Sequence, residues 1–299
     1  MPLDPNLAGH ETTPETGTIA AAAIAQFADA VGDANPLFHD AAAARAAGFA
    51  QVPAMPTFVT RFRVPFAEAG LDPEHSQVLH GEQEYAYTRP LLAGDTLAVR
   101  HRIASVRQSG RGGMAIMTIE QLGDTPGGER VVTGRSTVIV RDGAPEAAAA
   151  TAGATATNGA TKARPAVPEG EAIPTLSKTV TQPQINAYAE VSQDHNPIHI
   201  NPEAARVVGL DGTIAHGMLS MAFLGQLLTD WLATQPRRDG WVSRLRVRFQ
   251  GMVRPGDTLS CHGVLGEREG TQQHLSVWID NQRGERVVTG DTDVTLPAA

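Results

Sequence analysis

The chain has 299 residues, which is enough for two domains of ordinary size. Its formal charge is −8, from 24 basic and 32 acidic residues, and this balance argues against binding a phosphate backbone, which needs a basic surface. The single cysteine, Cys261, excludes an internal disulfide, and no stretch approaches the roughly 20 apolar residues that cross a bilayer. We therefore expect a soluble, cytoplasmic protein with no nucleic-acid or membrane partner.

The first half begins with a polar turn inside the segment FADAVGDANPLFHDAAAARAAGF, residues 27–49. Asp33 and Asn35 precede Pro36 there, and proline disfavours helical geometry in the residue before it. Further along, Pro65 lies within TFVTRFRVPFAEAG and is expected to break or kink a central helix. The glycine-rich stretch around Ser109 lacks the Lys-Ser/Thr of a phosphate loop and is interpreted as a hairpin turn.

The middle of the chain contains one apolar residue larger than alanine, Val167, between Val140 and Ile173. A segment of mixed Ala, Thr, Gly and Pro cannot bury a core. We predict a flexible linker at residues 142–172, between an N-terminal domain of residues 1–141 and a C-terminal domain of residues 173–299.

The second half is predicted to place one buried helix against a sheet. Thr181 is a plausible N-cap for a first helix, and the segment from His216 to Trp231 is apolar nearly all round, which indicates a helix buried on most sides. Alternating patterns then predict strands, listed here as SRLRVRFQ, TLSCHGVLG, HLSVWIDN and ERVVTGDTDVTL. The simplest arrangement that buries this helix is a curved antiparallel sheet wrapped around it.

The two halves are copies of one pattern. YAEVSQDHNPIHINPEAARVVGL (188–210) echoes the segment at 27–49, so that Asp194 follows Asp33 by 161 residues; LLAGDTL is echoed by VRPGDTL, and ERVVTG occurs twice. Duplication predicts an α+β fold of two sheets, each wrapped around a central helix. We expect the two copies to associate side by side through strand edges, because an unpaired edge is a liability.

The densest polar cluster is DHNPIH, followed by IAHGM at the start of the buried helix. A turn at Asn196–Pro197 can aim Asp194 and His199 into one pocket, with the amide of Gly217 near a helix N-terminus as a donor to a developing oxyanion. The alternative is that the Asx residues merely cap a turn. A metal site at Asp194, His195, His199 and His216 is disfavoured, because Pro197 breaks the helix that His-x-x-x-His ligation requires.

These motifs carry a family resemblance. The second half, with DHNPIH and AHGM, resembles the MaoC-like, or (R)-specific enoyl-CoA hydratase 2, branch of the hot-dog superfamily. The first half resembles the degenerate N-terminal hot dog of two-domain hydratases and of fused (3R)-hydroxyacyl acyl-carrier-protein dehydratase subunits. The resemblance covers nearly everything except the linker and the first few residues, and it implies a double hot-dog fold.

The resemblance also implies a reaction, the reversible hydration of trans-2-enoyl thioesters to (R)-3-hydroxyacyl thioesters in fatty acid metabolism. Asp194 and His199 would activate one water and deliver its proton, Asn196 would orient that array, and the Gly217 amide would polarise the thioester carbonyl. His216 would contact substrate. The carrier is CoA or an acyl carrier protein, and we expect no metal or redox cofactor. The sequence does not decide whether two copies of the chain form a homodimer.

The first copy is predicted to be inactive, since its histidine, His39, follows Asp33 by six residues instead of five, and a one-residue slip redirects a side chain. VPAMP at residues 52–56 also replaces the His-Gly motif. The break at Pro65 is expected to leave room for a longer acyl chain. Two other functions remain alternatives: a non-catalytic acyl-thioester binding protein and a hot-dog thioesterase.

Charged side chains occupy equivalent strand positions in the two copies. The shared GDTL segment aligns Arg244, Arg246 and Arg248 with Glu82, Glu84 and Ala86. Either these are solvated faces of little energetic consequence, or opposite charges pair between the copies and favour their association. Arg248 is alternatively placed to reach the phosphates of the carrier.

Overall fold

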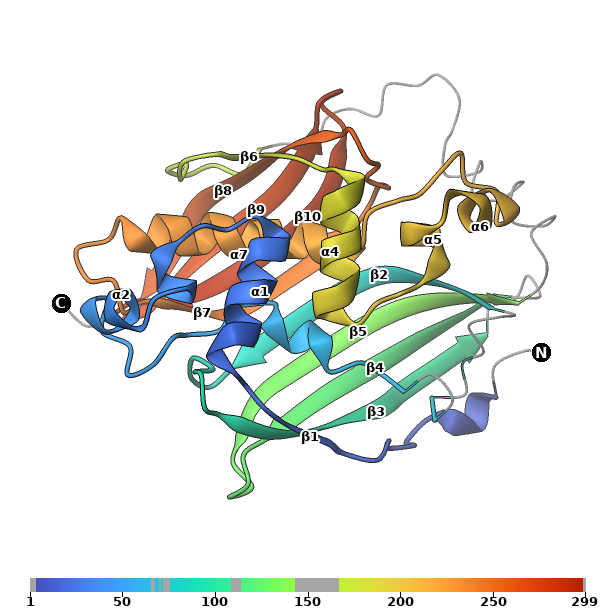
Figure 1. Cartoon of the computed structure of the whole chain (residues 1–299), viewed down its shortest axis with the longest axis horizontal. Helices are drawn as coiled ribbons and strands as arrows, with labels where there is room; N and C mark the ends of the chain where they lie inside the picture. Colours follow the sequence, from blue (N-terminus) through green and yellow to red (C-terminus); the bar gives the residue numbers. More distant parts are fainter. Residues whose placement is uncertain are drawn as a thin grey trace.

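The computed structural model describes residues 4–65, 68–69, 71, 76–108, 114–142 and 167–297. Within these residues the strands form one ten-stranded antiparallel sheet, in the order β1-β3-β4-β5-β2-β7-β10-β9-β8-β6 (Figure 1). The first half contributes β1 (Glu15–Thr18), β2 (Ser76–Tyr87), β3 (Thr96–Gln108), β4 (Met114–Asp124) and β5 (Arg130–Asp142). The second half contributes β6 (Leu176–Thr179), β7 (Trp241–Phe249), β8 (Thr258–Glu269), β9 (Gln272–Asn281) and β10 (Arg286–Thr295).

The helices of the second half follow the predicted order. They are α4 (Gln182–Ser192), α5 (Pro197–Ile200), α6 (Pro202–Val207) and α7 (Gly217–Ala233). Thr181 caps α4, because its hydroxyl accepts a hydrogen bond from the Gln184 amide at 3.3 Å. Helix α7 crosses the strands of its own half in Figure 1, and Leu219, Phe223 and Leu228 on it are fully buried. The segment that is apolar all round is therefore the buried helix that its sequence predicts.

The first half has a shorter element at the position of α7. Its helical elements are the 3-10 helices η1 (Pro5–Leu7), η2 (Pro36–Phe38) and η3 (Phe58–Arg61) and the α-helices α1 (Ala21–Val31) and α2 (Ala41–Ala46). After η3 the described backbone runs without regular structure to Pro65, where a proline cannot continue a helix. The sequence predicts that Pro65 breaks or kinks the central helix of the first half; residues 66–67 and 70, which follow it, lie outside the described part.

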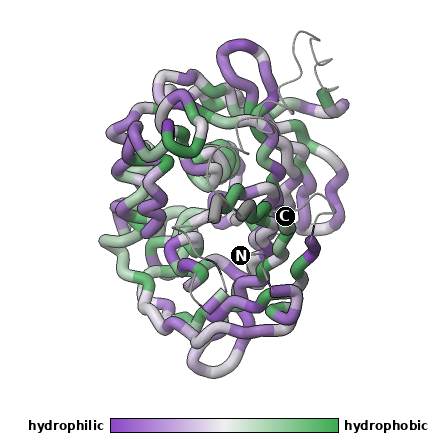
Figure 2. The backbone as a smooth tube through the Cα atoms, turned by 90° about the vertical axis from the view of Figure 1, so that its right-hand side faces the viewer, coloured by the Kyte–Doolittle hydropathy of each residue, from purple (hydrophilic) through white to green (hydrophobic). Residues whose placement is uncertain are grey.

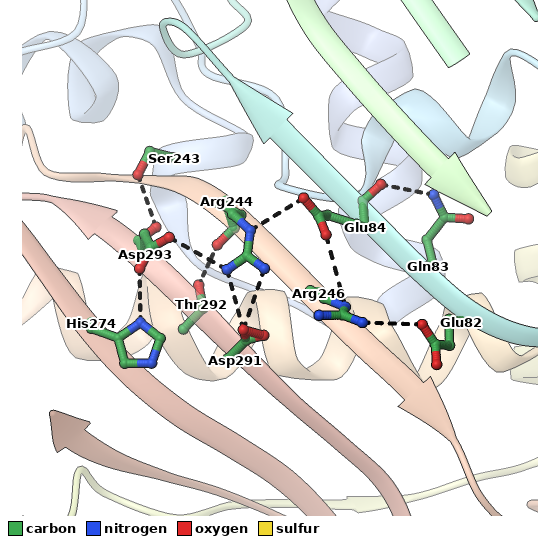
Figure 3. Close-up of polar contacts among 10 residues, drawn as sticks. All are labelled: Glu82, Gln83, Glu84, Ser243, Arg244, Arg246, His274, Asp291, Thr292 and Asp293. Atoms are coloured by element: carbon green, nitrogen blue, oxygen red, sulfur yellow. Dashed lines mark hydrogen bonds and ion pairs between the residues drawn. The ribbon is translucent and has the colours of Figure 1, made fainter. Parts of the chain in front are cut away.

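The two halves join through an antiparallel pair of strands, as their exposed edges predict. β2 pairs with β7, with Glu82 opposite Arg248 and Glu84 opposite Arg246. Figure 3 shows the charges along this seam: Arg246 bonds Glu82 at 3.2 Å, and Arg244 bonds Glu84 at 3.2 Å. The predicted pairing of opposite charges between copies is present. Exposed pairs contribute about 0–1 kcal/mol each, so their main effect is to select this strand pairing.

Side chains from both halves also meet beside the sheet. Phe27 of α1 and Tyr188 of α4 pack edge to face with their ring centroids 5.7 Å apart, and α1 lies next to α4 in Figure 1. Both side chains are fully buried and belong to one hydrophobic core shared by the halves. In Figure 2 hydrophilic and hydrophobic stretches follow one another closely along the backbone, and a hydrophilic loop lies at the upper edge.

Most of the linker predicted at residues 142–172 lies outside the described residues, since 143–166 are not among them. The domain limits at 141 and 173 therefore stay predictions. Among the described residues, no helix is long and apolar enough to span a membrane.

Candidate active site

A turn at the end of α4 places the two dyad residues predicted from the sequence. Gln193 ends the helix in a left-handed conformation, at φ 59°, and the Asp194 amide donates back to the Ala189 carbonyl at 3.1 Å. Asn196 then caps α5 through its side-chain oxygen, which accepts from the Ile198 amide at 3.3 Å. Pro197 supplies the first residue of that helix, so that His199 emerges one turn after Asp194.

His216 connects this turn to the start of α7. Although it is the N-cap residue of α7, its side chain does not cap the helix; its Nε2 donates to the Asp194 carbonyl at 2.9 Å. His199 donates from Nδ1 to the Ile214 carbonyl at 2.8 Å, which leaves its Nε2 without that proton. The two rings lie 3.8 Å apart between centroids, and one polar atom from each of Asp194, His199 and His216 lies within 4.8 Å of the others.

Arg63 of the first half supplies the positive charge of the site. Its Nη1 donates to Oδ2 of Asp194 at 3.0 Å. Burial disfavours the charged carboxylate, but Arg63 together with the two histidines outweighs it and holds the pKa of Asp194 below its ordinary value. At neutral pH the carboxylate is therefore ionised.

Burial also disfavours the charged form of the two histidines, and for a base this lowers the pKa. It lowers the pKa of His199, and it lowers the pKa of His216 to about 4, with each group's neighbours adding smaller effects. Both imidazoles are thus neutral at pH 7. A carboxylate and a neutral imidazole with a free nitrogen face one another, which is the arrangement of a general base and its partner.

Arg63 was not among the site residues predicted from the sequence. It lies in the segment of the first half that corresponds to α7, and 131 residues separate it from Asp194. The available signal was its residue type, because an arginine in place of an apolar core helix needs a partner when it is partly buried. Nothing in the local pattern identifies that partner.

A cavity of about 230 Å³ opens from these groups into the first half. Its polar end is lined by Asp194, Asn196, His199, His216 and Gly217. On the side of the first half, the apolar residues that line it are Phe62, Val64, Leu71, Ile119 and Val138, here called its apolar end. Polar residues of the same half, among them His80, Gln83, His101 and Ser136, line it as well. The apolar end lies where the first half has η3 in place of a long helix, and buried Gln121 fixes that segment by donating to the carbonyls of Val59 and Phe62 at 3.1 and 2.9 Å.

Gly217 is the first residue of α7, so its amide has no acceptor within the helix. It lines the cavity, and a Cβ at this position would lie 3.2 Å from the Phe249 ring, a closer approach than side chains normally make. Glycine therefore lets the helix N-terminus sit against the pocket wall. The amide is available to a ligand oxygen and carries the partial positive charge of the helix end.

The remaining predicted residues lie apart from this centre. Arg248 donates to Glu82 at 2.8 Å at the seam, and its side chain is 62% exposed. It is not among the residues that line the cavity, so its predicted contact with carrier phosphates stays a prediction. His195 is exposed and bonds Glu190 at 3.2 Å, away from the other histidines.

The carboxylate and imidazole groups are close enough to be considered as metal ligands. Asp194, His199 and His216 lie within the distance that a single ion would bridge, whereas the fourth candidate, His195, points elsewhere. Arg63 disfavours a cation, because its guanidinium already holds the carboxylate at 3.0 Å. The geometry suits proton transfer better than metal ligation.

Family comparisons agree with this architecture. The profile of the FAS1-like dehydratase domain region matches residues 6–134, and that of the MaoC like domain matches residues 165–283. The chain therefore combines a FAS1-like dehydratase domain region with a MaoC-like domain. The family recognised from DHNPIH and AHGM is therefore confirmed, and the matched ranges contain both copies of the turn.

Individual relatives match either about half of the chain, by sequence, or nearly all of it, by structure. A UPF0336 protein of Parafrankia sp. is 37% identical over 151 residues, which are 48% of this chain and 99% of the relative. A MaoC-like dehydratase structure superposes with a TM-score of 0.79 at 23% identity, covering 97% of this chain and 98% of the other. A Mycobacterium tuberculosis protein described as having a double hotdog fold gives a TM-score of 0.68 at 14% identity, over 96% of each chain. The double hot-dog fold is confirmed.

Proposed function

We propose that the protein catalyses the reversible hydration of trans-2-enoyl thioesters to (R)-3-hydroxyacyl thioesters. One observation carries the proposal: an ionised carboxylate, Asp194, and a neutral imidazole, His199, face the same cavity beside the free N-terminal amide of α7. Addition of water to a conjugated thioester requires a base, an acid and a donor to the developing oxyanion.

In this mechanism one water lies between the Asp194 carboxylate and Nε2 of His199. As its oxygen bonds to C3 of the substrate, the water gives a proton to the pair. The pair then returns a proton to C2 on the same face, so that the elements of water are added and both residues are restored. Negative charge accumulates on the thioester oxygen in between, where the Gly217 amide donates to it.

Arg63 is assigned a positioning role in this mechanism, because it contacts Asp194 and not the reacting atoms. Its charge keeps the carboxylate ionised in a pocket whose burial favours the neutral form. Asn196 holds the turn through the cap of α5, and His216 holds the Asp194 carbonyl.

The acyl chain is proposed to occupy the apolar end of the cavity, among Phe62, Val64 and Val138 of the first half. This assigns the catalytic groups to residues 173–299 and the acyl-binding wall to residues 1–141. The carrier is CoA or an acyl carrier protein, and the reaction belongs to cytoplasmic fatty acid metabolism. Since apolar residues of both halves line the cavity, we expect substrates longer than four carbons to be turned over.

The decisive experiment follows the loss of enoyl-thioester absorbance with crotonyl-CoA and with dec-2-enoyl-CoA. Wild type should hydrate both, and Asp194→Asn and His199→Gln should each lose activity by orders of magnitude while keeping their circular dichroism. Release of free thiol would instead identify a thioesterase. Failure to turn over CoA and carrier-protein thioesters alike would refute the hydratase proposal.

A further inference from the structure

A second cavity, of about 350 Å³, lies beside the turn of the first half. One wall is η2 with its cap, from Asn35 to Phe38, and another is the segment from Pro53 to Pro56. The opposite wall comes from the second half, where Leu232 of α7 and Trp241 and Val242 of β7 line it. The cavity therefore combines the turn of one half with a strand start of the other.

This construction repeats that of the active-site cavity. Residues separated by the repeat distance of 161 or 162 line the two cavities in pairs, namely Leu37 and Ile198, Tyr87 and Phe249, and Leu91 and Val253. The relation also holds across the seam, because Leu79 and His80 line the first cavity and their counterparts Trp241 and Val242 line the second. The second cavity is thus the counterpart, in the duplicated fold, of the acyl-binding cavity.

Both histidines of the active site have been replaced in this counterpart, although Asp33 keeps the position of Asp194. Phe38 stands in the repeat at the position of His199, and Ala54 stands at that of His216. His39 takes over a structural bond, since its Nε2 lies 2.9 Å from the Asp33 carbonyl, as that of His216 does from the Asp194 carbonyl. The lining that results is mainly apolar, and the Tyr87 hydroxyl within it is satisfied by the Pro56 carbonyl at 2.6 Å.

One cation belongs to the lining. Arg238 is exposed, and within the described part of the chain it makes no hydrogen bond or ion pair. An apolar cavity with a single free guanidinium suits a ligand with a hydrocarbon chain and an anionic head. The carboxylate of a free fatty acid and the phosphates of CoA both provide such a head.

We propose that the second cavity binds an acyl chain without reacting with it, which makes the protein a carrier of two acyl groups, one at each end of the seam. The class of ligand rests on the proposed function, because it is argued from likeness to the acyl cavity. The occupancy of the second cavity does not depend on whether the first one catalyses hydration.

Titration calorimetry with decanoyl-CoA and, separately, with decanoate tests the proposal. Neither probe has the double bond that hydration requires, so binding is measured without turnover. Wild type should bind two equivalents of the probe that fits both cavities. Leu37→Trp fills the second cavity and Ile198→Trp is its matched control in the first, and each should bind one equivalent.

The outcomes separate the two proposals. A single equivalent for wild type with both probes, or a second equivalent that survives Leu37→Trp, overturns the second site. A second equivalent seen with decanoate alone identifies a fatty acid site, and one seen with decanoyl-CoA identifies a thioester site. If Leu37→Trp fails to fold, Ala54→Leu narrows the same cavity. If wild type binds two equivalents but does not hydrate enoyl thioesters, the hydratase proposal is refuted and this inference stands.

Arg238→Gln gives a second measurement. It should weaken the second equivalent at least several-fold while leaving the first equivalent, which Leu37→Trp retains, at its wild-type affinity. An unchanged affinity for both equivalents would show that Arg238 does not bind the anionic head of the ligand and would contradict the proposed recognition.

Discussion

The two Asp-x-Asn-Pro turns are nearly the same locally, and they differ in what the other half of the molecule brings to them. Asp33 and Asp194 each accept a bond from the amide two residues on, at 2.9 and 3.4 Å. Arg63 then reaches Asp194 at 3.0 Å, whereas Lys178, the cation near Asp33, donates to the Gly32 carbonyl at 2.8 Å.

The titration of the two carboxyl groups follows from this difference. Burial raises the pKa of Asp33, although the Asn35 amide and the charges of Lys178 and His39 oppose it. The pKa of Asp194 is lowered, because the charge of Arg63 and of the histidines overcomes the same burial. A turn motif therefore provides the position of a carboxyl group, and the opposing half decides its charge.

The largest expected contrast comes from the same substitution in the two copies. Asp194→Asn should lower kcat for enoyl-thioester hydration by about 10²- to 10⁴-fold, because general acid–base catalysis contributes on that order. Asp33→Asn should stay within a few-fold of wild type, since no reacting group lies near it. Steady-state kinetics on both variants make the comparison. Equal losses would show that the first copy shares in catalysis.

Acid should destabilise the protein through its buried histidines. The pKa of His101 and of His216 is lowered to about 4 in the folded protein, chiefly by burial, against 6.5 for a free side chain. Between these values the unfolded chain binds more protons, so stability is complete above pH 6.5 and falls as the pH approaches 4. For His216, which is 2% exposed, the full loss is about 3 kcal/mol.

Urea unfolding at pH 7.5, 6 and 5 measures how the free energy of unfolding falls with pH. His101→Gln should make this fall less steep, whereas His195→Gln, which replaces an exposed histidine, should leave it unchanged. A slope that is the same in all three proteins would argue against burial of a neutral His101.

A smaller effect is expected from the charge that distinguishes the two turns. Arg63→Met removes a cause that lowers the pKa of both Asp194 and His199, so both pKa values should rise. The acid limb of the pH profile of kcat/KM should then move to higher pH, so the loss of activity should be largest on the acid side of neutrality and small at pH 7. Lys178→Met is the matched control and should leave the profile in place. An unmoved profile in Arg63→Met would reduce Arg63 to a packing role.

Sequence reasoning recovered the elements that depend on short stretches of chain. The polar turn at Asn196–Pro197 and the buried helix from Gly217 both follow from local residue types. The pairing of β2 with β7 was also predicted, because the repeat implies two equivalent edges. Arg63 was missed, since its partner lies in the other half and no motif surrounds it.

By itself, the sequence determined that the chain is duplicated, that each copy has an Asx-Pro turn, and that the second copy retains a His-Gly helix start. These features are local, because capping, proline geometry and hydrophobic periodicity act within a few residues. The tertiary structure alone decided that the pKa of Asp194 is lowered and that of Asp33 raised, that His39 bonds a backbone carbonyl, and that a second apolar cavity persists. Those properties depend on burial and on charges contributed from across the seam, which no local pattern specifies.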